Sequence, residues 1–225
     1  KLPYRPEELK LLQKVSSSKP LDIIVENIGQ YTGSKRNQIR ADYCDVVYKV
    51  SSPLALDFSG KGFLPGKQSE GPVFDVDGDG FKERMSSLGK TAGLLALDLN
   101  NNGLIDNGTE LFGDATFVSA KNGKAAHGFE ALAQYDLNQD QIIDFRDLVY
   151  ADLRIWMDLN KNGVSEAAEL LTLEEVGVAE IDLRYLDGSD VDIYGNNALQ
   201  RSVYRTPSGL TRYIADIWFL TESVE

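Results

Sequence analysis

Short apolar runs alternate with clusters of Asp, Asn and Gly from residue 53 onward. The segments that show this pattern are LALDFSGKG, VFDVDGDG, LLALDLNNNG, LAQYDLNQDQ and RIWMDLNKNG. Their first Asp residues stand at positions 57, 75, 98, 136 and 158, and these intervals are too irregular for a solenoid with a fixed period. The pattern therefore predicts a repeated local structure within one domain.

Between and after these clusters the apolar spacing predicts helices and then strands. Residues 128–135 and 145–157 have helical spacing, and Leu148, Leu153 and Trp156 are expected on a shared inner face. After residue 170 the pattern favours strands. The expected strands cover residues 178–186, 198–205 and 210–220, the last two joined as a hairpin by a Thr-Pro-Ser-Gly turn.

Residues 1–50 differ from the rest in charge. They hold nine basic and six acidic side chains (+3), whereas the remainder holds 14 basic and 29 acidic side chains (−15). Residues 6–15 have Pro and acids at their start and Lys toward their end, as a short helix would, and residues 21–30 are a second candidate. We therefore expect an N-terminal helical or linker segment over 1–50 and the main domain over 51–225.

The net charge of −12 argues against binding the nucleic-acid backbone or an anionic membrane, because both need clustered cationic surface. No apolar run approaches the roughly 18 residues that span a bilayer, so we expect no membrane insertion. Cys44 and His127 are each the only one of their kind, which excludes a disulfide framework and a zinc cage. Cys44 is expected to be a small buried apolar residue. Because the chain begins at Lys1 rather than Met, we expect it to be part of something longer.

The acidic clusters have the spacing of calcium loops. Calcium takes six to eight oxygens, and an EF-hand loop supplies them from positions 1, 3, 5, 7, 9 and 12, with Gly at position 6. Residues 158–169 match throughout, and residues 136–147 match except that Gln141 replaces the Gly. A side chain with positive φ there should cost about 1 kcal/mol. The expected ligands are Asp158, Asn160, Asn162, the Val164 carbonyl, Glu166 and Glu169, and Asp136, Asn138, Asp140, the Ile142 carbonyl, Asp144 and Asp147.

Two earlier clusters keep only the first half of this pattern. Position 12 is Ser86 in one and Thr109 in the other, so the closing ligand must come from elsewhere. For the second cluster the nearest candidates are Glu110, one residue late, and Asp114. The expected ligands are Asp75, Asp77, Asp79 and Glu83, and Asp98, Asn100, Asn102, Leu104, Asp106 and Glu110.

The cluster at residue 57 is a degenerate copy, since Ser59 and Lys61 stand where acids would be. Any one cluster could instead be a solvated turn, because Asp, Asn and Gly dominate turns. Carboxylates about 4 Å apart repel by roughly 1 to 4 kcal/mol, however, and each loop brings several together. We therefore predict Ca²⁺ as a folding ligand, about three to four ions, in preference to Mg²⁺, which favours compact octahedral sites. The expected fold class is α+β, with EF-hand-like calcium loops, short helices and a C-terminal antiparallel β-hairpin or sheet.

Five motifs follow one another along the chain: SPLALDFSGKGF, VFDVDGDGF, GLLALDLNNNGLIDNGTELFGD, GFEALAQYDLNQDQIID and LRIWMDLNKNGVSEAAELLTLEEVGV. This ordered series resembles the calcium-dependent self-processing module of FrpC-like RTX toxins and adhesins. The resemblance covers about residues 53–185. It implies secretion by a Gram-negative bacterium, and calcium-triggered cleavage of an Asp-Pro bond just before the Leu-x-Leu-Asp run. The freed aspartyl group can then link to a lysine amine.

That cleavage needs an Asp side chain that attacks its own backbone carbonyl, but Ser52 precedes Pro53 and none of the seven prolines follows Asp. We therefore expect a non-catalytic calcium-stabilised module of a secreted or cell-surface protein, which folds after export and spaces or docks neighbouring domains. One alternative is self-processing at Ser52-Pro53, although no activating base is expected beside that serine. Another is a calcium-dependent binder of an extracellular protein or glycan through Trp156 or Trp218, for which core packing is the competing interpretation.

Overall fold

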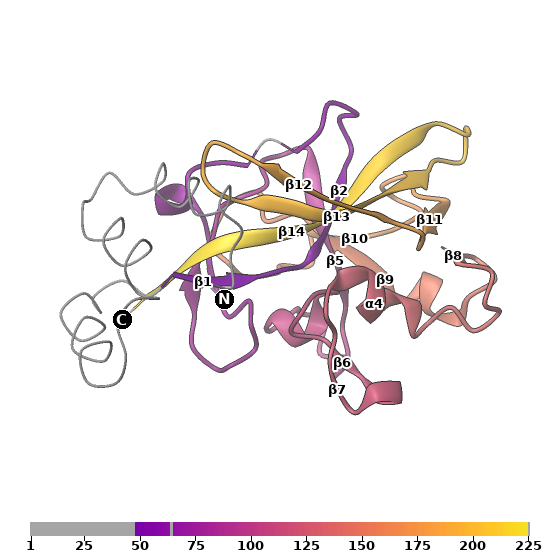
Figure 1. Cartoon of the computed structure of the whole chain (residues 1–225), viewed down its shortest axis with the longest axis horizontal. Coiled ribbons are helices and arrows are strands. Elements are labelled where there is room, and N and C mark those ends of the chain that lie inside the picture. The colour runs from indigo at the N-terminus through magenta and orange to yellow at the C-terminus, as the bar shows by residue number, and fades with distance from the viewer. Residues whose placement is uncertain (1–47, 64, 225) are drawn as a thin grey trace, which may run out of the picture.

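The structure is a computed structural model that describes residues 48–63 and 65–224 (Figure 1). The helices expected over 6–15 and 21–30, and the burial expected for Cys44, lie outside the described residues. The predicted division at residue 50 is not tested and stays a prediction.

One antiparallel sheet of twelve strands organises the described part of the chain. Its main path runs β10-β9-β5-β2-β14-β13-β11-β8, while β1, β3, β4 and β12 pair at its sides, and β6 and β7 form a separate hairpin. The strands are β1 (Tyr48–Ser51), β2 (Leu54–Asp57), β3 (Val73–Phe74), β4 (Glu83–Arg84), β5 (Ala92–Leu97), β6 (Phe117–Val118), β7 (Gly123–Lys124), β8 (Ile142–Asp144), β9 (Leu153–Trp156), β10 (Leu170–Thr172), β11 (Glu180–Asp182), β12 (Leu186–Val191), β13 (Asn197–Arg205) and β14 (Thr211–Ser223).

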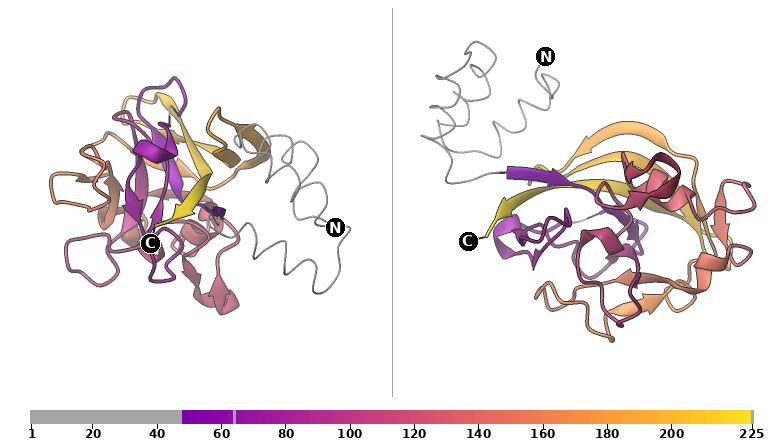
Figure 2. Two further views of the ribbon diagram at one scale, coloured as in Figure 1. Left: turned by 90° about the vertical axis from the view of Figure 1, so that its left-hand side faces the viewer. Right: turned by 90° about the horizontal axis from the view of Figure 1, so that it is seen from below.

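The sheet curls, and its long strands arch over the loops that connect the others (Figure 2). Alternate residues of its central strands enter two different cores because successive side chains point to opposite faces. Leu54 and Leu56 of β2 belong to the core that also contains Phe129, whereas Ala55 belongs to the core that contains Phe74 and Trp156. The central strands are therefore buried on both faces.

Helical structure is limited to short segments among the described residues. The α-helix α4 (Gly128–Ala133) confirms the expected helix, and His127 caps it by accepting a hydrogen bond at Nδ1 from the Glu130 N–H at 3.2 Å. The 3₁₀ turns are η2 (Gln68–Glu70), η3 (Gly108–Glu110), η4 (Ser119–Lys121) and η5 (Leu148–Ala151).

The predicted α+β fold with EF-hand-like helices is wrong, because the described chain is mostly β. Loops at 75, 98 and 158 follow strands β3, β5 and β9 instead of helices. The physical reason is burial on both faces: the run Ala92–Leu97 is buried at all but its last position and so lacks the alternation that marks a half-exposed strand.

The expected helix over 145–157 is also wrong. It divides into the turn η5 and the strand β9, which pairs with β5 and β10. The expected shared inner face is wrong as well, because Leu153 and Trp156 are buried in different cores and Leu148 is 82% exposed. Cross-strand pairing from distant parts of the chain outweighs local helical spacing here.

The C-terminal hairpin is confirmed. Strands β13 and β14 pair antiparallel from Arg205 with Thr211 to Asn197 with Trp218, around the turn that contains Pro207. The strand expected over 178–186 is observed as β11 and the start of β12. Within the described residues, none of the helices has the length and apolar character needed to cross a membrane.

Candidate metal centre

Four acidic loops begin with the same turn: loop 75 (residues 75–86), loop 98 (98–110), loop 136 (136–147) and loop 158 (158–169). The first Asp accepts the N–H of position 5 with one oxygen and the N–H of position 6 with the other. In loop 158, Asn162 and Gly163 donate these bonds to Asp158 at 3.1 and 3.0 Å. The same pair of bonds occurs in the other three loops.

The side chains at positions 3 and 5 hold the same turn from within. Position 3 accepts the N–H of position 5, and position 5 accepts the N–H of position 7, in all four loops. The side-chain oxygens of positions 1, 3 and 5 are therefore gathered at one turn. The proposed carbonyl ligands Leu104, Ile142 and Val164 occupy position 7, and their role stays a prediction.

Positions 4 and 6 have positive φ in each of these loops. Lys161 and Gly163 have φ values of 63° and 69° in loop 158, and Gln141 has 66° in loop 136. The prediction that Gln141 has a left-handed backbone is thus confirmed. Because Gly usually takes this position at no steric cost, Gln141 marks a conformation held by its surroundings.

Two acids close loop 158. Glu169 is buried, and its Oε1 accepts the N–H of Leu159, at position 2, at 2.9 Å. Its Oε2 is buried without a hydrogen-bond partner. Glu166, at position 9, accepts hydrogen bonds from the side-chain amides of Asn160 and Asn162.

In loop 98 the late Glu110 makes the equivalent contact. Its Oε1 accepts the N–H of Leu99, again at position 2, at 3.0 Å, and its Oε2 accepts the N–H of Asp106 at 2.7 Å. The turn η3 accommodates the extra residue before Glu110. Asp106 accepts from the amides of Asn100 and Asn102, as Glu166 does in loop 158. This geometry favours Glu110 over Asp114 as the closing residue.

Loop 75 brings three acids together. One carboxylate oxygen from each of Asp75, Asp77 and Glu83 lies within 4.8 Å of the others. Glu83 is buried, and its Oε2 accepts the N–H of Val76 at 3.3 Å. Ser86, at position 12, accepts instead from the Asn196 side chain at 3.1 Å, so it faces away from a closing role.

Loop 136 differs because an arginine lies among its acids. Arg146 donates through one terminal nitrogen to Asp140 and Asp144, each at 2.7 Å. Asp147, at position 12, is buried and accepts the N–H of Asp144 at 3.1 Å through Oδ2. Its Oδ1 is buried without a hydrogen-bond partner.

The degenerate loop that begins at Asp57 keeps the turn, but the Ser59 hydroxyl donates to the first Asp. Asp57 accepts from the Ser59 side chain at 2.6 Å and from the Gly62 N–H at 2.7 Å. Gly60 and Gly62 have the positive φ values of positions 4 and 6. The backbone thus follows the other loops, while Ser59 and Lys61 replace the acids or amides of positions 3 and 5.

Loops 75, 98 and 158 form a contiguous group, here called the three-loop cluster. The Ser165 hydroxyl in loop 158 accepts the Ile105 N–H at 2.6 Å and donates to the Ile105 carbonyl at 3.2 Å, and both residues stand at position 8. Gly108 at the end of loop 98 donates to the Asp75 carbonyl at 2.7 Å. A Cβ on Gly163 would lie 2.2 Å from the Val73 carbonyl, so loop 158 packs tightly against β3. The contact made by Ser165 carries no motif signal, and sequence reasoning missed it.

The donor set fits a hard divalent cation. Carboxylate and amide oxygens are the ligands that calcium prefers. Glu169 and Asp147 each have a buried carboxylate oxygen without a hydrogen-bond partner, and both residues stand at position 12, where an EF-hand loop has a bidentate acid. Burial raises the pKa of the Glu169 carboxyl, and the neighbouring Glu166 carboxyl acts in the same direction. A cation at this position would satisfy that oxygen and offset the cost of burying the charge.

Carboxylates also surround the Ser52-Pro53 junction, contrary to expectation. Asp114 accepts from the Ser51 hydroxyl at 2.7 Å and the Ser52 N–H at 2.9 Å, while its own N–H donates to the Ser52 carbonyl at 3.1 Å. The fully buried Asp216 faces Ser52 and accepts the Gly128 N–H at 3.0 Å. Burial raises the pKa of Asp216 to about 7.

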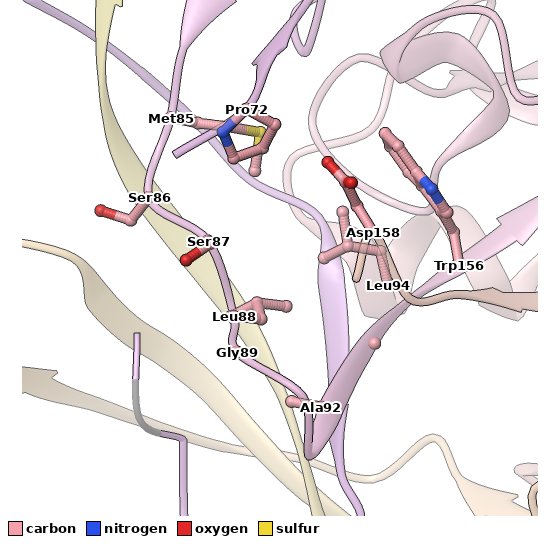
Figure 3. Close-up of a pocket in the computed structure, with 11 residues that line it drawn as sticks. Pro72, Met85, Ser86, Ser87, Leu88, Gly89, Ala92, Leu94, Trp156 and Asp158 are labelled. Atoms are coloured by element: carbon pink, nitrogen blue, oxygen red, sulfur yellow. The ribbon is translucent and has the colours of Figure 1, made fainter. Parts of the chain in front are cut away.

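Trp156 belongs to the core, as predicted. It is 2% exposed and its ring centroid lies 4.8 Å from that of Phe74. The cavity beside it, between Pro72, Met85 and Asp158, has a volume of about 30 Å³ and would admit about one water molecule (Figure 3). Trp156 therefore has no room to stack on a sugar, whereas Trp218 is half-buried.

Comparisons with known proteins agree with the motif series. The family model for the SPM domain matches residues 54–220. The chain is 40% identical over 179 residues to the iron-regulated protein FrpA of Neisseria meningitidis serogroup C, an alignment that covers 79% of this chain and 16% of that protein. The chain thus spans about a sixth of the length of that relative. From the family match and this identity, the chain belongs to the SPM domain family.

Proposed function

We propose that this domain is a calcium-binding, calcium-stabilised module of a secreted or cell-surface RTX-type bacterial protein. The observation that carries the proposal is the shared loop geometry: four loops gather oxygens at positions 1, 3 and 5 through the same hydrogen bonds. Two of them hold a buried, unpartnered carboxylate oxygen at position 12. Identity to FrpA and the family match support the RTX and extracellular assignments.

The residues that would hold the ions are the acids and amides of the four loops. Calcium would supply only charge neutralisation and cross-linking, since it binds oxygens without redox chemistry. In the three-loop cluster the ions would brace segments that are far apart in sequence. The role is therefore folding and rigidity, with spacing or docking of neighbouring domains as its consequence.

Calorimetry tests this role directly. With 1 mM calcium and a dissociation constant near 10 μM, mass action stabilises the fold by roughly 2 to 3 kcal/mol for each occupied site. We expect a higher melting temperature in calcium than in EGTA, and reversal on chelation. Equal melting temperatures in calcium and in EGTA would contradict the proposal. Asp158→Asn together with Glu169→Gln should lose part of the gain, whereas Ser59→Ala in the degenerate loop should keep it.

We propose further that the module does not process itself. A serine that attacked its own carbonyl would have to form a strained β-lactone, whereas the cleavage that the resemblance implies uses an Asp side chain, and Ser52 stands at that position. Asp114 and Asp216 beside Ser52 are the observation that favours the self-processing alternative. Incubation of the full chain in calcium, followed by a denaturing gel, distinguishes the non-processing module from self-processing. An intact band supports the non-processing module, and two fragments produced by cleavage near Ser52 support self-processing.

The ligand-binding alternative has one structural feature in its favour. An open groove of about 400 Å³ lies between residues 60–63 and Pro65 on one side and strands β12 to β14 on the other, and Asp190, Arg201 and the half-exposed ring of Tyr213 line it. Exposed aromatic and charged groups are typical of sites that bind glycans or proteins. Binding on a glycan or peptide array that Tyr213→Ala abolishes would favour this function, and inertness would remove it.

A further inference from the structure

Loop 136 neutralises its acids in a different way from loops 98 and 158. In those two loops an Asn at position 5 donates to the acid at position 9: Asn102 to Asp106 at 2.8 Å and Asn162 to Glu166 at 2.6 Å. Loop 136 has Asp140 and Asp144 at these positions, and neither carboxylate can donate a hydrogen bond when ionised. Besides the Asn138 side-chain amide, which donates to Asp140 at 3.2 Å, a cationic side chain supplies a donor here.

Arg146 is that donor, and its guanidinium occupies the space between the two acids. Its Nη2 lies 2.7 Å from one oxygen of each carboxylate, and its Nε lies 3.0 Å from both oxygens of Asp144. Charge-assisted bonds of this kind are short and specific in geometry.

The arginine leaves one carboxylate of the loop unsatisfied. Asp147, at position 12, is 3% exposed, and its Oδ1 has no hydrogen-bond partner, although its Oδ2 bonds to the Asp144 N–H inside the same loop. An ion bound at loop 136 would compete with Arg146 for Asp140 and Asp144, and Asp147 Oδ1 is a further carboxylate oxygen of the same loop. Arg146 is half-exposed, so it can swing into solvent when an ion arrives.

We propose that Arg146 is an internal counter-cation of loop 136, which calcium must displace, and that loop 136 therefore fills at higher calcium concentration than loops 98 and 158. This inference rests on the proposed calcium binding. Its consequence is a graded response: loops 98 and 158 rigidify first, and loop 136, which follows α4 and contains β8, rigidifies only when calcium is abundant.

A calcium titration of the ¹⁵N-labelled full chain, followed by NMR, resolves each loop through its own amides. We expect Ile142 to shift at higher calcium than Leu104 and Val164. Arg146→Gln removes the competing charge, so loop 136 should bind roughly three- to tenfold more tightly, as expected for a half-exposed ion pair next to a cation. Arg146→Lys keeps the charge but loses the planar fork, and its affinity should lie between the two.

Arg184→Gln is the matched control, because Arg184 makes the same local contact with Asp182 two residues earlier, outside the loops. It should leave all calcium affinities unchanged. Unaltered or weaker binding by loop 136 in Arg146→Gln, while loops 98 and 158 bind normally, overturns the inference alone. If no loop amide shifts in the unaltered chain, the proposed calcium function fails with it. Spectral dispersion shows whether each variant is folded.

Discussion

Asp216 is a residue whose charge the fold strongly controls. It lies on the face of β14 that packs against α4, is fully buried, and accepts the Gly128 N–H. Burial raises its pKa to about 7, and the nearby Asp114 carboxylate acts in the same direction. The folded protein therefore holds a proton on Asp216 at pH values where the unfolded chain has released it.

This proton links stability to pH with a definite sign. Between pH 4 and 7 the folded state binds more protons than the unfolded state at this position, so the free energy of unfolding falls as pH rises and then levels off above 7. The contribution is on the order of 2 to 4 kcal/mol. We expect Asp216→Asn to flatten the pH profile and to gain stability relative to the unaltered chain at pH 8.

Urea denaturation at several pH values measures this difference. The exposed Asp152→Asn serves as the control and should leave the profile unchanged. If Asp216→Asn keeps the full slope between pH 4 and 7, the proton resides elsewhere.

Gln141 shows how far local chemistry was predictable at the residue scale. Its positive φ followed from its alignment with Gly in the other loops, and the structure confirms it. The role of Glu110 was only one of two possibilities, because one inserted residue obscures the pattern that the turn η3 restores. The carboxylates beside Ser52 carried no signal at all, since Asp216 lies more than 160 residues away.

At the scale of elements, the pairing of loops 98 and 158 through Ser165 predicts coupling between their ions. The Ser165 hydroxyl satisfies both the N–H and the carbonyl of Ile105, and all of these groups are buried. Its removal leaves a buried N–H without a partner, at a cost of about 1 to 3 kcal/mol. We expect Ser165→Ala to destabilise the domain by that amount and to reduce the cooperativity of calcium binding.

Isothermal titration with and without the Ser165 hydroxyl checks this coupling. Ser208→Ala removes an exposed hydroxyl and should behave as the unaltered chain does. Loss of stability without any change in the shape of the binding isotherm would contradict the coupling.

For the molecule as a whole, the two cores should respond unequally to calcium. The three-loop cluster borders the core that contains Phe74, Val76, Ile105 and Trp156, whereas loop 136 borders the core of Phe129 and Ile143. Because three of the loops border one core, the local stability of that core should depend more strongly on bound calcium. We expect EGTA to increase amide hydrogen exchange in β3 and β5 more than in α4.

Hydrogen exchange monitored by mass spectrometry resolves these segments. Equal changes in both cores, or a larger change in α4, would show that the three-loop cluster does not act as a unit. The long strand β13 provides an internal reference, because it is paired on both sides by β12 and β14 and is remote in sequence from the loops.

Local geometry followed from the amino-acid pattern: the positions of the acidic turns, the left-handed residue at their position 6, α4 and the β13–β14 hairpin. These features depend on contacts within a dozen or so residues, which spacing can report. Tertiary structure alone decided that the apolar runs before the loops are strands, that three loops touch while the fourth stands beside β11, and that Ser52 meets Asp114 and Asp216. Such contacts join residues far apart along the chain, and both a buried strand and a buried helix present the same apolar run until the partner strand is known.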